Sequence, residues 1–381
     1  MNKGPYFPAV ACGLGLFGLL LAGCSPKVDD SVIRIGEYDA LSGDIATFGT
    51  TTHEGIVMAV EEINAAGGIH GKKVVLITED DEGKPEQAAL VAEKLLTDDQ
   101  VHALIGEVAS SNSLAVAPIA QRYAIPMVSP SSTNPKVTQQ GDYIFRVCFI
   151  DSFQGKVAAK FAFDTLKARK AAILRDEKSD YSLGLADVFA ADFKAAGGTI
   201  VADKAYMGGD VDFKAQLTSL RDSKPDLIYV PGYYGEVGLI ARQARAIGLK
   251  QPLLGGDGWE SEELYKIGGS ALNNCYFTNH CAPDSPDKVV RDFVAKYEAR
   301  WKHEPGALAM LGYDAVNVLA DAINRAPDLR GHSIRDALAA TKDFRGVTGM
   351  ISMDADRNAV KSAVVLQIKD GKAVYRETVN P

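Results

Sequence analysis

Short runs of apolar residues alternate along the chain with longer segments in which apolar residues recur every three or four positions. Residues 74–77, Val-Val-Leu-Ile, are typical of a buried strand. Within residues 49–66, Ile56 and Val60 share one helical face, and two glycines follow as a stop signal. Because the predicted strands are apolar throughout, we expect helices to cover both faces of each sheet.

This alternation runs to about residue 148 and then starts again, which predicts two doubly wound α/β lobes. Open sheets of this kind bind ligands beyond the carboxyl ends of their strands, so two facing edges predict a cleft. The predicted strands cover residues 31–38, 74–77, 101–106, 125–128, 144–148, 170–174, 199–206, 226–230, 252–254, 275–278 and 363–368, with one more near 350. The predicted helices cover residues 49–66, 85–96, 112–123, 153–166, 183–196, 213–220, 235–247, 260–267, 288–301, 307–324 and 334–340.

The amino-terminal segment has the pattern of an export signal. Lys3 precedes an apolar run over residues 9–22 that is too short for a comfortable membrane-spanning helix. The run ends in Leu-Ala-Gly-Cys24, which resembles the lipobox of bacterial lipoproteins, in which the cysteine is lipidated. We therefore expect a lipoprotein signal peptide over 1–23, a tether over 24–31 and an exported protein whose acyl chains hold it to a membrane. An ordinary signal peptide with an incidental cysteine and an uncleaved anchor are the alternatives.

Composition and charge reduce the number of function classes that fit this chain. The 381 residues are 46% hydrophobic and 24% charged, as in an ordinary globular protein, and the formal net charge is −8. Such an acidic chain disfavours binding to nucleic acid. The chain has no P-loop, no G-x-S-x-G and no H-E-x-x-H motif, and its six histidines are scattered. The sequence thus predicts no metal, no cofactor and no enzyme activity, although folding could still assemble a catalytic triad.

Two hydroxyl-rich segments follow consecutive strands of the first lobe. Residues 107–113 include Ser110, and residues 129–135 include Ser131 and Thr133. Helix capping and an ordinary polar turn are the simplest explanations. Because consecutive strands bring both segments to one sheet edge, we favour an anion site, suited to a carboxylate.

Three strands of the second lobe end near aromatic or acidic residues, namely Tyr181, Tyr233 and Asp257. Each segment could be a surface loop, and each aromatic could simply pack. Together on one rim, however, a carboxylate among aromatic rings suits a primary ammonium group.

Short sequence strings along the chain carry a further signal. They are Leu41-Ser42-Gly43, Phe48-Gly49, residues 62–71, residues 176–181, Tyr233-Tyr234-Gly235-Glu236 and residues 241–249. These strings resemble landmarks of the leucine/isoleucine/valine-binding proteins of bacterial amino-acid ABC transporters. The resemblance extends over the chain beyond the signal segment, and the Ile-Asn-Ala-Ala-Gly-Gly-Ile-x-Gly string is its most specific part.

The resemblance implies a type I periplasmic-binding-protein fold, with two Rossmann-like lobes joined by three hinge crossovers near 147–149, 279–281 and 360–363. An amino-terminal lobe would comprise 32–148 plus 281–360, and a carboxy-terminal lobe 149–280 plus 361–381. The lobes would close on the bound molecule like a hinged trap.

The resemblance also implies site residues. Ser110 and Thr133, with backbone groups around Ser131, would bind an α-carboxylate. Asp257, where many relatives have Glu, would hold the α-ammonium. Tyr181 and Tyr233 would close over the ligand, and the side-chain pocket would be lined by Phe48, Val108 and Leu308.

The cysteines depart from the family pattern. The family's disulfide in the amino-terminal lobe has no counterpart, because Gly83 and Ala109 stand at the matching positions. Cys148 and Cys281 lie instead at two of the expected crossovers, which suggests a disulfide bond between them. Two unlinked thiols are the alternative.

The resulting expectation is a lipid-anchored, monomeric substrate-binding protein that faces the periplasm or the cell exterior. It would deliver an amino acid, branched-chain or otherwise aliphatic, to the membrane subunits of an ABC permease. A sensory receptor of the same fold, a binding protein for an amide or small aromatic acid, and an enzyme using the cleft are the alternatives. Asp257→Ala is expected to weaken binding without changing the melting temperature of the ligand-free protein.

Overall fold

One parallel sheet and one mostly parallel sheet dominate the computed structural model, which describes residues 1–4, 31–282 and 284–381. Most of the expected signal peptide, the expected lipidation site Cys24 and most of the expected tether lie outside the described residues. Among the described residues, no helix is both long enough and apolar enough to cross a bilayer.

The first sheet has five parallel strands in the order β2-β1-β3-β4-β5. Its apolar strands are buried because α1, α2 and α3 cover it, and Ile35 of β1 pairs with Leu76 on one side and Ala103 on the other. The elements are β1 (Ile33–Asp39), α1 (Ala46–Ala65), β2 (Val74–Asp80), α2 (Pro85–Thr97), β3 (Ala103–Ile105), α3 (Ser110–Tyr123), β4 (Met127–Ser129), η1 (Thr138–Gln140) and β5 (Ile144–Arg146).

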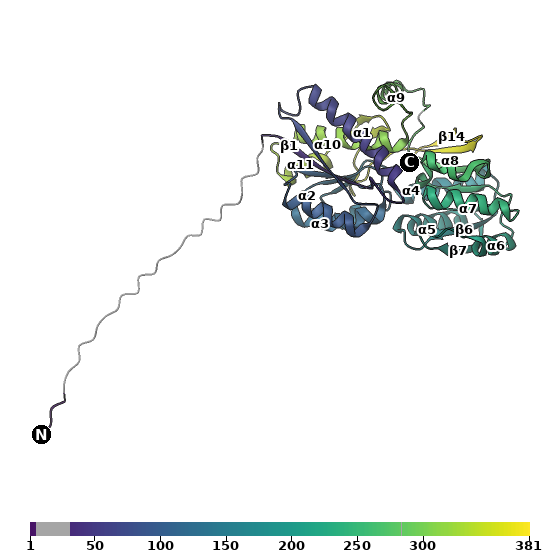
Figure 1. The fold of residues 1–381 in the computed structure, drawn as a ribbon, viewed down its shortest axis with the longest axis horizontal. Helices are drawn as coiled ribbons and strands as arrows, with labels where there is room; N and C mark the ends of the chain where they lie inside the picture. Colours follow the sequence, from purple (N-terminus) through teal and green to yellow (C-terminus); the bar gives the residue numbers. More distant parts are fainter. Residues whose placement is uncertain (5–30, 283) are drawn as a thin grey trace.

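The second sheet repeats this parallel arrangement as β7-β6-β8-β9-β10 and adds two antiparallel strands, β13 and β14, beside β10. Figure 1 shows its helices grouped at the opposite end of the molecule from α2 and α3. The elements are α4 (Asp151–Lys160), η2 (Phe161–Thr165), β6 (Lys170–Asp176), α5 (Asp180–Ala195), β7 (Thr199–Tyr206), α6 (Lys214–Asp222), β8 (Leu227–Tyr229), α7 (Tyr234–Ala246), β9 (Leu253–Gly255), η3 (Asp257–Trp259), α8 (Glu262–Gly268), η4 (Gly269–Leu272), β10 (Cys275–Asn279), β13 (Ala363–Lys369) and β14 (Lys372–Val379).

A third group of elements returns to the first lobe, where α10 packs against α1 (Figure 1). The two helices approach so closely that a Cβ on Gly55 would lie 1.9 Å from the carbonyl oxygen of Ala309. The elements are α9 (Lys288–Trp301), α10 (Ala307–Arg325), α11 (Gly331–Ala339), β11 (Phe344–Gly346) and β12 (Gly349–Ile351).

The predicted fold of two doubly wound lobes joined by three crossovers is confirmed. The chain passes between the sheets after β5, after β10 and before β13. The predicted helix over 153–166 begins earlier and ends in a π-helical turn, and β14 was not predicted. The lobe boundaries given above remain our proposal.

The expected Cys148–Cys281 bridge is not formed. Cys148, Cys275 and Cys281 are free, buried thiols. The Cys148 thiol donates to the Ser132 carbonyl at 3.5 Å, whereas the Cys281 thiol contacts Met310 Sδ at 3.3 Å. The two sulfur atoms therefore have separate partners, and burial raises the pKa of Cys148 to about 12.

Candidate functional site

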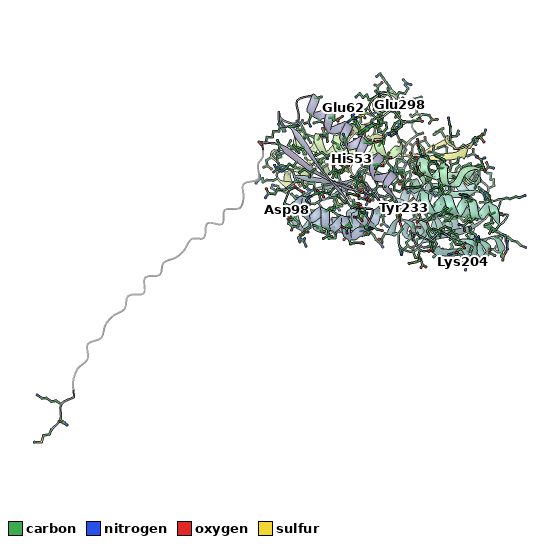
Figure 2. The ribbon with its side chains drawn as sticks, in the orientation of Figure 1. His53, Glu62, Asp98, Lys204, Tyr233 and Glu298 are labelled. Atoms are coloured by element: carbon green, nitrogen blue, oxygen red, sulfur yellow. The ribbon has the colours of Figure 1, made fainter. Side chains whose placement is uncertain are left out.

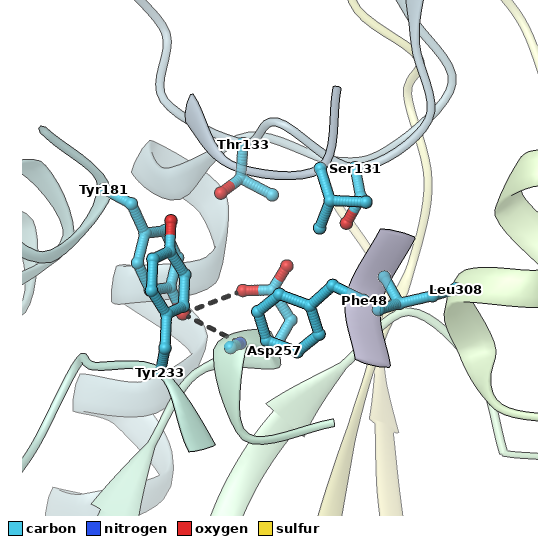
Figure 3. Close-up of a pocket in the computed structure, with 9 residues that line it drawn as sticks. Phe48, Ser131, Thr133, Tyr181, Tyr233, Asp257 and Leu308 are labelled. Atoms are coloured by element: carbon cyan, nitrogen blue, oxygen red, sulfur yellow. Dashed lines mark hydrogen bonds between the residues drawn. The ribbon is translucent and has the colours of Figure 1, made fainter. Parts of the chain in front are cut away.

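A small, tightly lined cavity lies between the two lobes (Figure 3). Its walls come from loops and helix starts beyond the carboxyl ends of strands in both sheets, where this class of fold binds ligands. The lining residues are Phe48, Val108, Ser131, Thr133 and Leu308 from the first lobe, and Tyr181, Tyr233, Asp257 and Gly258 from the second.

Every site residue predicted for ligand binding lines this cavity except Ser110. The Ser110 hydroxyl accepts a hydrogen bond from the Asn134 N–H at 3.2 Å, so it supports the neighbouring loop. Its role as a direct carboxylate ligand stays a prediction. Figure 2 shows Tyr233 at the junction of the two lobes, between elements far apart in the sequence.

Asp257 forms the acidic side of the cavity. One carboxylate oxygen accepts hydrogen bonds from the Tyr181 hydroxyl and the Gln154 amide, both at 2.9 Å. The other oxygen lies 2.9 Å from His280 Nε2. Burial lowers the pKa of His280, so the imidazole is neutral and donates from Nε2. Asp257 is thus held in place by three buried donors.

Gln154 ties this acid to the rest of the second lobe. Its carbonyl oxygen accepts from the Asp257 N–H at 2.9 Å and from the Thr278 hydroxyl at 2.7 Å. Its amide nitrogen donates to Asp257 and, at 3.2 Å, to Asp151. All the hydrogen-bonding groups of this side chain are therefore in use, and its two amide N–H groups bind the carboxyl groups of Asp257 and Asp151.

Asp151 lies beside Asp257 at the base of the cleft. It is fully buried, and one of its carboxyl oxygens has no hydrogen-bond partner among the described residues. Burial, reinforced by the negative charge of Asp257, raises the pKa of Asp151 to about 8. Asp151 is therefore protonated at neutral pH, and Asp257 faces the cavity beside a neutral neighbour.

Residues 129–134 form the opposite, hydroxyl-bearing side. The Ser132 N–H donates to Ser129 Oγ at 2.8 Å, and the Thr133 carbonyl accepts from the Asp151 N–H at 2.9 Å. The N–H groups of Ser131 and Thr133 and the Thr133 hydroxyl have no partner among the described residues. These groups are suited to receive an anion.

The remaining walls are apolar. The ring of Phe48 meets that of Tyr233 edge-on, with centroids 5.5 Å apart, and Tyr233 stacks on Tyr181 at 5.4 Å (Figure 3). Val108 and Leu308 complete this surface. A short aliphatic side chain fits such a wall, because it buries apolar area without leaving polar groups unpaired.

Hydrogen bonds across the mouth of the cleft hold the lobes together. The Ser111 hydroxyl donates to Asp180 at 3.0 Å and accepts from the Asp180 N–H at 3.1 Å. The Asn134 amide donates to the Asp180 carbonyl at 2.8 Å. The structure is thus a closed arrangement of the two lobes.

Ser111→Ala is expected to weaken binding of the ligand in the cleft about 30-fold, mainly through faster dissociation. It removes two cross-lobe hydrogen bonds that exist only in the closed arrangement, each worth about 1 kcal/mol. Stopped-flow binding kinetics measures this change. Ser219→Ala on α6, which makes no hydrogen bond to the first lobe among the described residues, is the control. An unchanged dissociation rate for Ser111→Ala would contradict this role.

Sequence reasoning missed Gln154, His280, Asp151 and Arg146, which all support the lining residues. Arg146 is a single cation within an apolar strand, and Asp151 and Gln154 are polar residues of a helix start with buried neighbours. A polar side chain among buried neighbours must have hydrogen-bond partners, so these positions in the sequence could have been identified as supporting residues. His280 gave no comparable signal. No group of His, Cys, Asp or Glu within the described ranges is arranged to hold a metal ion.

Comparisons with known proteins agree with this geometry. A protein family described as periplasmic binding protein matches residues 32–373. The Leu/Ile/Val-binding protein BraC3 of Rhizobium johnstonii is 35% identical over 325 residues, which cover 84% of this chain and 87% of that protein.

Two solved structures are also similar. The leucine-binding protein LivK of Thermotoga maritima shares 40% identity and a TM-score of 0.88, over 92% of this chain and 99% of that one. The branched-chain amino acid transporter substrate-binding protein LivJ of Streptococcus pneumoniae, solved with isoleucine, shares 38% identity and a TM-score of 0.87. That match covers 92% of this chain and 100% of that one.

Proposed function

Because the chain belongs to the periplasmic binding protein family, we propose that it captures an aliphatic amino acid between its lobes and delivers it to an ABC permease. The observation that carries this proposal is the opposed chemistry of the cavity. A carboxylate stands on one lobe, free N–H and hydroxyl groups stand on the other, and apolar side chains lie between them.

In the proposed complex, Asp257 accepts the α-ammonium group. The α-carboxylate binds the free groups of Ser131 and Thr133, with Ser110 behind them. The aliphatic side chain packs on Phe48, Val108 and Leu308, under Tyr181 and Tyr233. No covalent bond changes, and binding shifts the population toward the closed arrangement because each lobe recognises one end of the same molecule.

The amino-terminal segment completes the proposal. Cleavage before Cys24 and its lipidation would leave the monomeric binding protein on a membrane, facing the periplasm or the cell exterior and close to the permease. The isoleucine complex of the LivJ relative supports the choice of a branched-chain ligand.

Calorimetric titration of the ligand-free protein with the twenty amino acids tests this function. We expect leucine, isoleucine or valine to bind at micromolar concentration or tighter, and aspartate and lysine not to bind, because the wall cannot pair a second charge. Failure of every amino acid to bind would contradict the proposal. Recovery of unchanged ligand separates binding from catalysis, and uptake by cells with and without the protein separates transport from sensing.

A further inference from the structure

Arg146 is a buried cation without an ion pair. Arg146 is 0% exposed and forms no ion pair within the described residues, and the carboxyl groups of Asp151 and Asp354 act on it only at longer range. The guanidinium donates instead to the carbonyls of Ser132 and Asn134 and to the Thr138 hydroxyl, while its Nε–H has no partner in the described part of the chain. A buried charge normally has a counter-charge, so this arrangement is unusual.

These hydrogen bonds determine which way the cleft loop faces. The peptide between Ser132 and Thr133 is planar and trans, so its carbonyl and its N–H point in opposite directions. Because Arg146 binds the carbonyl, the Thr133 N–H points away from Arg146. Thr133 lines the cavity, and its N–H and hydroxyl are both unpartnered within the described residues.

We infer that Arg146 is a positioning residue for the carboxylate of the bound amino acid. It fixes the 131–134 loop so that donors face the cavity, and its charge stabilises the anion from behind through the Ser132–Thr133 peptide. This inference rests on the proposed function. The ligand carboxylate thus gives the guanidinium a nearby counter-charge, in addition to the more distant carboxyl groups of Asp151 and Asp354.

Arg146→Met tests the inference by comparing leucine with leucinamide, which lacks the carboxylate. In the variant, we expect the Kd of leucinamide divided by the Kd of leucine to fall at least 10-fold, because the affinity for leucine decreases more than the affinity for leucinamide. Arg357→Met is the matched control, since Arg357 is a partly buried arginine that donates only to the carbonyls of Ile144 and Thr138. Equal losses for leucine and leucinamide in Arg146→Met would assign Arg146 a purely structural role and overturn the inference.

A second measurement uses the unmodified protein, so it does not depend on the variant folding. In ¹⁵N-labelled protein, leucine should shift the Thr133 amide and Arg146 Nε–H resonances, whereas leucinamide should leave them near their ligand-free positions. Unmoved resonances at saturating leucine would overturn the inference. If no amino acid binds at all, the proposed function fails, which is a separate and recognisable result.

Discussion

Asp257→Asn is expected to weaken the binding of leucine about 100-fold while changing the free energy of unfolding by no more than about 1 kcal/mol. In the proposed complex the substitution removes the charge that would pair with the ammonium group, and losing one partner of a buried charge pair costs about 3 kcal/mol. Asparagine can keep the existing hydrogen bonds, because His280 can move its proton to Nδ1, which has no partner among the described residues, and accept at Nε2. Calorimetry and thermal melting measure the two quantities.

Asp164→Asn is the control for this experiment, since Asp164 is an exposed carboxylate paired with Lys160, and it should leave the affinity unchanged. Equal affinity of Asp257→Asn and the unmodified protein for leucine would contradict the assignment of Asp257 as the ammonium-binding residue. The structure also changes the expectation for Asp257→Ala. That substitution would leave the Gln154, Tyr181 and His280 donors unpaired, so it should lower the melting temperature as well.

Asp151→Asn is expected to make the protein more stable than the unmodified form at alkaline pH. The pKa of Asp151 is raised to about 8, so its ionisation contributes no difference in stability below about pH 4, where folded and unfolded forms are both protonated. As pH rises from about 4 to about 8, the unfolded form loses this proton first, and the folded form becomes less stable. The difference reaches at most about 5 kcal/mol near pH 8.

Denaturant unfolding of both proteins between pH 4 and 9 measures this effect. The difference between the two proteins isolates Asp151, because Asp81, whose pKa burial raises to about 6, and the buried Asp39 and Glu107 contribute equally to both. Asp222→Asn, at an exposed carboxylate beside Arg221, should show no such divergence. Parallel stability curves for Asp151→Asn and the unmodified protein would show that Asp151 is not protonated in the folded state.

The order of strands and helices could be predicted because apolar periodicity reports burial directly. The strand Thr199–Tyr206 and the helix Lys288–Trp301 have the predicted bounds. The strand Lys372–Val379 escaped prediction because it lies at the sheet edge with most of its residues exposed, so its sequence has no apolar run. The π-helical turn at Phe161–Thr165 depends on how α4 meets the sheet, which periodicity does not encode.

The cavity walls could be anticipated because most of the predicted residues follow a predicted strand or belong to a string shared with the family, whereas Leu308 was implied by the family resemblance alone. Supporting residues are harder to predict, because their role depends on contacts between distant segments. Gln154 reaches Asp257 from a helix more than a hundred positions earlier, and His280 approaches from the second crossover. Ser110 is the opposite case. It lies in a segment that was correctly predicted to reach the cavity, but its hydroxyl accepts a hydrogen bond from the neighbouring loop.

The close contact between α1 and α10 affects the sequence of events when the chain is made. Helix α1 is synthesised early, but the helix that covers it, Ala307–Arg325, follows only after the entire second sheet apart from its last two strands. Until then, an apolar face of the first lobe has no permanent cover, and closing so long a loop is slow. We therefore expect the second lobe to acquire its parallel core before the first lobe is complete.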